Sequence, residues 1–214
     1  MSDPQAWPAP RYAWYATGVL TVAYTLSYVD RQILSMLVGP IKADLGLSDT
    51  QVGLLQGFAF AVFYTLVGIP MGRLADRGDR RRLIAWAVLA WSLATAACGL
   101  ARSYGQLFLA RVGVGVGEAA LGPAAYSMIV DCFPPERRGR AMGFYSTGVY
   151  LGIGLAATIG GAVVGRLAGS PPLVLPLVGS ISAWQVTFFV VGLPGLLVAA
   201  WIATLREPAR QGNV

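Results

Sequence analysis

Apolar segments long enough to cross a lipid bilayer recur along the whole chain, and they constrain its fold more than any other feature. Of the 214 residues, 56% are hydrophobic and only 12% are charged, about half the charged fraction of a typical soluble domain. A hydrocarbon core about 30 Å thick is crossed by about 20 apolar residues of helix. The sequence predicts an all-α integral membrane protein that spans the bilayer six times, with Ser48 as the N-cap of the second helix. The predicted spans are 12–38, 50–71, 83–101, 107–130, 141–165 and 184–205.

The lysines and arginines between these spans are distributed unevenly over the two sides of the membrane. One side receives three of them: Lys42, Arg102 and Arg166. The other receives eleven: Arg11, Arg73, Arg77, Arg80, Arg81, Arg82, Arg137, Arg138, Arg140, Arg206 and Arg210. Because positive loops stay in the cytoplasm, we expect the tails 1–11 and 206–214 to be cytoplasmic and the protein to lie in a plasma membrane, the inner membrane of a bacterium. The net charge of +6 reflects this orientation, so no nucleic-acid partner is predicted.

Two further features concern packing and connections. The pairs Gly113 with Gly117, Gly148 with Gly152, and Gly161 with Gly165 have the spacing that lets membrane helices approach closely. The segment 170–180 is apolar but contains three prolines, and we interpret it as an external connection near the membrane surface.

Charged residues occur inside two of the predicted spans. Asp30 and Arg31 lie about ten residues before the outer end of the first helix near Pro40, a depth of roughly 15 Å at 1.5 Å per residue. Glu118 lies eleven residues into the fourth helix, which enters from outside at about Leu107, a depth of roughly 16 Å. The two carboxylates are therefore predicted to lie near the midplane of the bilayer.

Arg111 precedes Glu118 by seven residues, two helical turns, so both side chains leave similar faces of the fourth helix. A charge at the centre of a lone helix costs roughly 2.5–3.5 kcal/mol. Two interpretations remain: a structural ion pair that locks the first helix to the fourth, or a midplane site whose carboxylates titrate. The second fits two successive three-helix units in the inverted arrangement found in transporter halves. Because the chain has no histidine, a carboxylate is the natural proton carrier.

The turn between the second and third spans, GRLADRGDRRRLI (72–84), is rich in arginine. Its pattern resembles the signature G-x-L-A-D-R-x-G-R-[KR]-x-x-[LI] of the major facilitator superfamily, with Asp79 in place of the second glycine. The resemblance implies a gate on the cytoplasmic side. The residues that it assigns to this gating motif are Gly72, Asp76, Arg77, Arg80 and Arg81.

The fourth span resembles a second pattern of the superfamily, R-x-x-x-G-x-G, through Arg111, Gly115 and Gly117. The combination of YVDR on the first span with GVGEAA on the fourth is similar to the Spinster-type transporters. That resemblance implies a secondary active transporter rather than an enzyme. It assigns proton coupling and the substrate cavity to Asp30, Arg31 and Glu118.

The resemblance implies a small or amphiphilic organic solute and protons as the transported partners, with no cofactor and no metal. The anion–cation symporters also show Y-x-D-R and G-E-A and are the alternative branch. Symport and antiport both remain open, because Ile153 replaces the proline of the antiporter pattern on the fifth span.

The resemblance covers the N-terminal six-helix half of the superfamily fold, and three explanations compete for the half length. The chain could pair with a separately encoded second half, form a homodimer around a shared cavity, or be a truncated product. We favour truncation or a missing partner over a homodimer. A non-transporting membrane scaffold is the alternative from another functional class.

Overall fold

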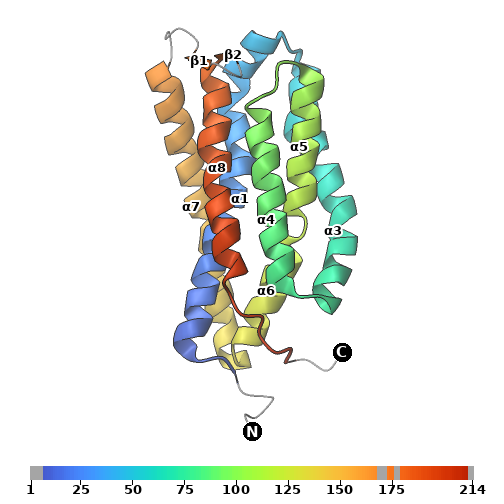
Figure 1. The fold of residues 1–214 in the computed structure, drawn as a ribbon, viewed down its shortest axis with the longest axis vertical. Helices are drawn as coiled ribbons and strands as arrows, with labels where there is room; N and C mark the ends of the chain where they lie inside the picture. Colours follow the sequence, from blue (N-terminus) through green and yellow to red (C-terminus); the bar gives the residue numbers. More distant parts are fainter. Residues whose placement is uncertain (1–6, 168–172, 176–178, 212–214) are drawn as a thin grey trace.

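The structure is a computed structural model that describes residues 7–167, 173–175 and 179–211. The described residues form six long helical segments that run side by side along the long axis of the molecule (Figure 1). The predicted all-α fold is therefore confirmed. The segments are α1 (Pro10–Leu45), α2 with η1 and α3 (Asp49–Gly53, Leu54–Phe58, Ala59–Arg77), α4 (Arg80–Cys98), α5 with α6 (Tyr104–Glu118, Leu121–Cys132), α7 (Pro135–Leu167) and α8 (Ala183–Ala203).

The first and last described residues lie at the same end of the bundle, which we call the terminal end (Figure 1). At the opposite end, β1 (Leu173–Leu175) pairs antiparallel with β2 (Gly179–Ile181). These short strands belong to the predicted external connection 170–180, of which 170–172 and 176–178 lie outside the described residues. The limits of the spans within the bilayer stay a prediction, because the structure fixes only where the helices end.

Polar caps explain where several helices begin. The Ser48 side chain accepts a hydrogen bond from the N–H of Gln51, whose side chain accepts one from the Ser48 N–H, so the predicted N-cap is confirmed as a capping box. Asp79 and Ser103 cap α4 and α5 more simply: each side chain accepts one hydrogen bond, from the N–H of Arg82 and of Gln106 respectively. At the other end of α1, Gly46 takes the left-handed conformation with φ 63°, which glycine adopts without steric cost.

Two of the predicted spans are not continuous α-helices. The second contains a π-helical turn at Leu54–Phe58, and the fourth is interrupted between Glu118 and Leu121. The interruption has a local cause in Pro123, which has no N–H to donate to the carbonyl of Ala119 and whose ring would collide with that carbonyl. The helix therefore breaks directly after its buried glutamate.

Glycines set the closest helix contacts. A Cβ added to Gly152 on α7 would lie 2.6 Å from the Thr25 carbonyl oxygen of α1, and one added to Gly117 on α5 would lie 2.7 Å from the Trp91 Cβ of α4. For Gly161 and Gly165 no described atom lies within 4 Å of an added Cβ. The packing interpretation of that last pair therefore stays a prediction, since an added Cβ would contact no other helix among the described residues.

Among the described residues, four helical segments are long and apolar enough to cross a membrane by length and composition: Asp49–Arg77, Tyr104–Cys132, Pro135–Val163 and Ala183–Ala203. α1 lies alongside them and contacts both α7 and α8. Its buried positions include Thr17, Thr21, Thr25 and Ser27. A helix enclosed by its neighbours can carry such polar residues because they do not meet lipid.

Candidate functional site

Four charged side chains from α1 and α5 meet in the middle of the bundle, and we call them the core cluster: Asp30, Arg31, Arg111 and Glu118. The Arg31 Nε donates a hydrogen bond of 2.7 Å to Glu118 Oε2, and the Ser27 hydroxyl donates a second one of 2.7 Å to the same oxygen. Glu118 is completely buried, whereas the Arg31 side chain keeps 24% of its surface exposed. The glutamate of this ion pair therefore lies in the closed interior, whereas the arginine side chain is partly accessible from a more open face of the bundle.

Arg111 and Asp30 lie on the enclosed side of this cluster. Both residues are buried, and Arg111 Nη1 donates a hydrogen bond of 3.2 Å to the backbone carbonyl of Asp30 rather than to its carboxylate. Among the described residues, no hydrogen-bond partner reaches Asp30 Oδ1, Arg111 Nε or Glu118 Oε1. Buried polar atoms normally have partners, so these three atoms of the core cluster are exceptions that need an explanation.

Aromatic rings surround the more open side of the core cluster. The guanidinium carbon of Arg31 lies 4.8 Å from the ring centroids of Phe60 and Tyr64 on α3, and 5.1 Å from that of Tyr28 on its own helix. A cation near such ring faces is stabilised by cation–π attraction. Arg31 is thus held in place by three rings and one carboxylate, with part of its surface accessible.

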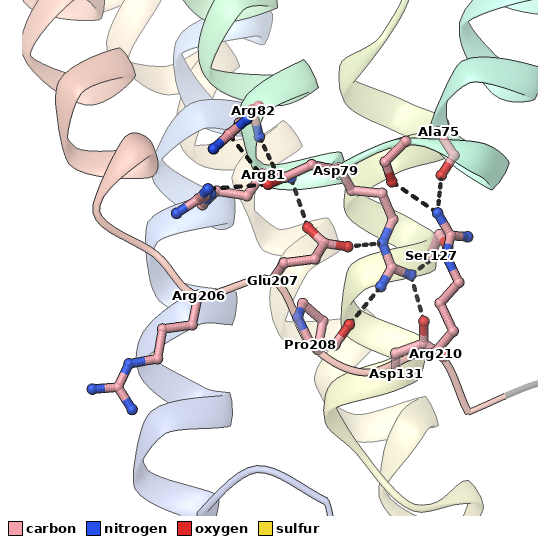
Figure 2. Close-up of polar contacts among 12 residues, drawn as sticks. Ala75, Asp79, Arg81, Arg82, Ser127, Asp131, Arg206, Glu207, Pro208 and Arg210 are labelled. Carbon is pink, nitrogen blue, oxygen red and sulfur yellow. Dashed lines mark hydrogen bonds and ion pairs between the residues drawn. The ribbon is translucent and has the colours of Figure 1, made fainter. Parts of the chain in front are cut away.

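A second network, which we call the end cluster, lies at the terminal end around Arg80, the first residue of α4. Its guanidinium is buried and donates to Glu207 Oε1 at 2.6 Å, to the Ser127 hydroxyl at 2.8 Å, to the Pro208 carbonyl at 3.0 Å and to Asp131. Figure 2 shows these four partners around a common centre. The chain that leaves α8 is thereby fixed to α4 and α6.

Further contacts hold this chain at the terminal end. The N–H of Arg81 donates to Glu207 Oε2, and the Arg81 guanidinium donates to the Leu205 carbonyl. Arg210 donates to the carbonyls of Ala75 and Gly78 (Figure 2). The segment 205–211 therefore lies against the arginine-rich turn at the terminal end.

Charge states in the end cluster follow from these contacts. Burial by itself would lower the pKa of Arg80, but its hydrogen bonds to Asp131 and Glu207 raise that pKa above the ordinary value. For Asp79, partial burial would raise the pKa of the carboxyl, yet the Arg82 N–H and the Arg81 guanidinium lower it below the ordinary value. Both groups therefore stay charged at neutral pH.

A model of the Major Facilitator Superfamily matches residues 20–214. The chain belongs to the major facilitator superfamily. It is 36% identical over 190 residues to an MFS-type efflux pump of Mycolicibacterium smegmatis (strain ATCC 700084 / mc(2)155), covering 89% of this chain and 41% of that protein. It is 33% identical over 190 residues to a probable L-galactonate transporter of Escherichia coli (strain K12), covering 88% of this chain and 38% of that one.

Among solved structures, a bacterial homolog of the human lysosomal transporter Spinster, in an inward-facing and occupied conformation, matches with a TM-score of 0.87 and 39% identity. The match covers 95% of this chain and 46% of that one. The predicted superfamily and the Spinster-like resemblance are confirmed, and the chain spans about half the length of the relatives that it matches.

The superfamily's glycine pattern on the fourth span has a physical reason in this structure. A Cβ on Gly115 would lie 2.8 Å from the Phe60 carbonyl oxygen of α3, and one on Gly117 would meet Trp91 of α4. These glycines let α5 approach both neighbours closely. Glu118, the residue after Gly117, is buried at this contact between α5 and α4.

The residues of the predicted gating motif divide into two groups. Arg80 and Arg81 join the end cluster, whereas Asp76 and Arg77 are exposed and Gly72 is half-buried on α3. Asp79, which departs from the superfamily signature, caps α4 by accepting a hydrogen bond of 2.8 Å from the Arg82 N–H. An aspartate at this position therefore has a structural function that glycine could not perform.

Sequence reasoning missed two sets of partners. The spacing of Phe60 and Tyr64, four residues apart on one helix face, was the available signal for the rings around Arg31. Glu207 has no comparable signal, because only the folded chain brings it to Arg80. Among the described residues, no group of three His, Cys, Asp or Glu side chains is placed to hold a metal ion.

Proposed function

We propose that this chain forms the N-terminal half of a secondary active transporter that couples protons to the movement of a small organic anion. The observation that supports it best is the Arg31–Glu118 ion pair, buried on the carboxylate side and partly exposed on the guanidinium side. Ionisable residues inside a membrane protein mark solute pathways and proton relays. The proposal places the protein in a bacterial inner membrane with both termini in the cytoplasm.

The geometry suggests how a proton and an anion would be coupled. The Arg31 guanidinium can pair with Glu118 or with an anionic group of the solute, and a proton on Glu118 removes its competing negative charge. Protonation of Glu118 would therefore free Arg31 to bind the solute. The proton and the solute would then cross the membrane together. Asp30 would accept a second proton beside Arg111, whose guanidinium sets the local potential.

Two observations support an organic acid as the solute: the chemistry of the Arg31 site and the similarity of the chain to a sugar-acid transporter. A guanidinium is a good partner for a carboxylate, and the rings of Tyr28, Phe60 and Tyr64 would accommodate an apolar portion. The E. coli relative is named for L-galactonate, which is a sugar acid. A small or amphiphilic carboxylate is therefore the proposed solute class.

The gate proposed at the cytoplasmic side combines the end cluster with the exposed part of the motif. Arg80 and Arg81 fix the chain after α8, while Asp76 and Arg77 are exposed at the same end. We propose that Asp76 and Arg77, with Gly72 allowing close approach, contact a second six-helix unit when the cavity closes on this side.

The second unit is proposed to cover α3 and α7. The segments Asp49–Arg77 and Pro135–Val163 are the least buried of the four candidate spans, and they expose large apolar residues such as Leu66, Ile69 and Tyr150. A separately encoded second half or a second copy of this chain would fit there.

The test measures proton movement in liposomes that contain the purified chain as a dimer, in which a second copy supplies the second six-helix unit, and a trapped pH-sensitive dye. An inward gradient of L-galactonate is expected to acidify the lumen, and Glu118→Gln and Asp30→Asn are expected to reduce that flux to the level of empty liposomes. The matched control is Glu136→Gln, which removes an exposed acid from the first turn of α7. It should leave the flux unchanged.

A flux that Glu118→Gln and Asp30→Asn both leave intact would contradict the proposed roles of these residues.

Light scattering on the purified chain in detergent, with the contribution of the detergent subtracted, gives the mass of the protein and therefore its oligomeric state. A folded dimer of the unaltered chain that moves no protons with this or another organic anion would favour a non-transporting scaffold.

A further inference from the structure

A groove runs between α4 and α8 at the terminal end, away from the faces of α3 and α7. Its volume is about 390 Å³, within the range of small-ligand sites. Apolar side chains form most of the wall, with Trp86 and Leu89 on α4 and Leu196 and Ala200 on α8, and Arg81 and Arg82 lie at one end. The groove is therefore apolar along its length and basic at its mouth.

The position of the groove corresponds to the predicted membrane boundary. Arg81 and Arg82 directly precede the third predicted span at residue 83, and Trp86 lies one turn inside it. Trp86 is 69% exposed on the outside of the bundle. Tryptophan is enriched at the headgroup level of membranes, so the mouth of the groove lies where lipid headgroups meet the acyl chains.

The charges at the mouth leave a net positive rim. Arg81 and Arg82 share one carboxylate, Asp79, at 3.0 and 3.4 Å (Figure 2). The Arg82 side chain keeps 74% of its surface exposed, whereas Arg81 also donates to the Leu205 carbonyl. Arg82 is thus able to reach an anionic group at the mouth while Arg81 stays in place.

We propose that this groove binds an anionic phospholipid of the cytoplasmic leaflet. The acyl chain would lie along the apolar wall, and the phosphate would accept hydrogen bonds from Arg82 and face the positive charge of Arg81. Basic pockets between membrane helices on the cytoplasmic side bind anionic headgroups in this way, and a guanidinium matches the geometry of a phosphate. The bound lipid would bridge α4 and α8 next to the chain that leaves α8.

The experiment is native mass spectrometry of the full chain released from detergent micelles doped with equal amounts of dioleoyl phosphatidylglycerol and dioleoyl phosphatidylcholine. We expect the unaltered chain to retain phosphatidylglycerol preferentially. Arg82→Gln should reduce that retention about fivefold, since one arginine near the membrane surface contributes about 1 kcal/mol to binding of anionic lipid. The matched control, Arg11→Gln, removes one exposed arginine from the same end of the bundle but outside the groove, and should change nothing.

A second variant tests the apolar part of the site. Ala200 is exposed on α8, so Ala200→Phe should fold normally and fill the groove, and it is expected to reduce phosphatidylglycerol retention with all arginines intact. An excess of inorganic phosphate should not displace the lipid if the acyl chain contributes. Equal retention of the two lipids, an equal effect of Arg11→Gln and Arg82→Gln, or full displacement by phosphate would each overturn the proposal.

Discussion

The core cluster and the end cluster are both built from arginines and carboxylates, yet they differ in how completely the atoms at their centres are paired. Among the described residues of the end cluster, unpaired buried nitrogens occur at its edge, in Arg81 Nε and Gln211 Nε2, and not in Arg80. Arg80 makes four hydrogen bonds through all three of its nitrogen atoms, to side chains and to a backbone carbonyl. In the core cluster, Arg31 and Ser27 both donate to the same oxygen of Glu118, while its other oxygen has no partner among the described residues.

This difference suggests that the two networks perform different tasks. A fully satisfied network rigidifies a structure, whereas a partly satisfied one carries the cost of unpaired polar atoms. All three side-chain nitrogens of Arg80 are satisfied, so the centre of the end cluster fits a fixed joint between helices. The core cluster fits a site that gains partners when a proton or a solute arrives.

The largest effect is expected from Arg80→Gln, which leaves Asp131 and Glu207 without their buried cation. Removing one partner of a buried ion pair costs roughly 3–5 kcal/mol, so the midpoint of thermal unfolding in detergent should fall by roughly 10 °C. The control Arg137→Gln, at an exposed arginine, should change stability by less than about 0.5 kcal/mol. A similar small change for Arg80→Gln would refute the view of the end cluster as a fixed joint.

A smaller effect is expected when the ion pair of the core cluster is altered. Glu118→Gln should cost about 2 kcal/mol, the contribution of a hydrogen bond to a charged group, because the three aromatic rings still hold Arg31. The double variant Arg31→Met with Glu118→Leu should regain most of that loss, since apolar replacement of a buried ion pair is often neutral. Thermal unfolding of the single and double variants gives the comparison, and a double variant less stable than Glu118→Gln would contradict it.

The smallest effect is expected at Asp79, the N-cap of α4. Asp79→Ala should cost about 1 kcal/mol, whereas Asp79→Asn keeps an oxygen that can cap the helix and should cost less. The pKa of Asp79 is lower in the folded protein than its ordinary value of 3.8. Its ionic contribution is therefore complete above that value and is lost as the pH falls below it.

This pH dependence is tested by measuring the unfolding midpoints of the unaltered chain and of Asp79→Ala at about pH 6 and about pH 3. The gap in stability between the unaltered chain and Asp79→Ala should narrow at the lower pH. A gap that widens would show that Asp79 does not act through its charge.

Local patterns predicted the features that depend on few residues. The run of apolar segments predicted the helices, and Ser48 predicted a helix start. Counting residues from the helix ends predicted that Asp30 and Glu118 lie at the same depth in the bilayer. In the structure Glu118 pairs with Arg31, the residue that follows Asp30. The π-turn at Leu54–Phe58 was not predicted, whereas Pro123 was a readable signal for the break after Glu118.

The sequence by itself determined the all-α membrane fold, the superfamily and the charged residues of the core, because helix length, hydropathy and charge are properties of contiguous residues. Only the tertiary structure decided that Arg31 pairs with Glu118 while Arg111 contacts the Asp30 backbone. It alone decided that Glu207 reaches Arg80, 127 positions away along the chain. The physical reason is that partner choice depends on helix rotation and close approach, and these are set by contacts between distant segments such as Gly117 against Trp91.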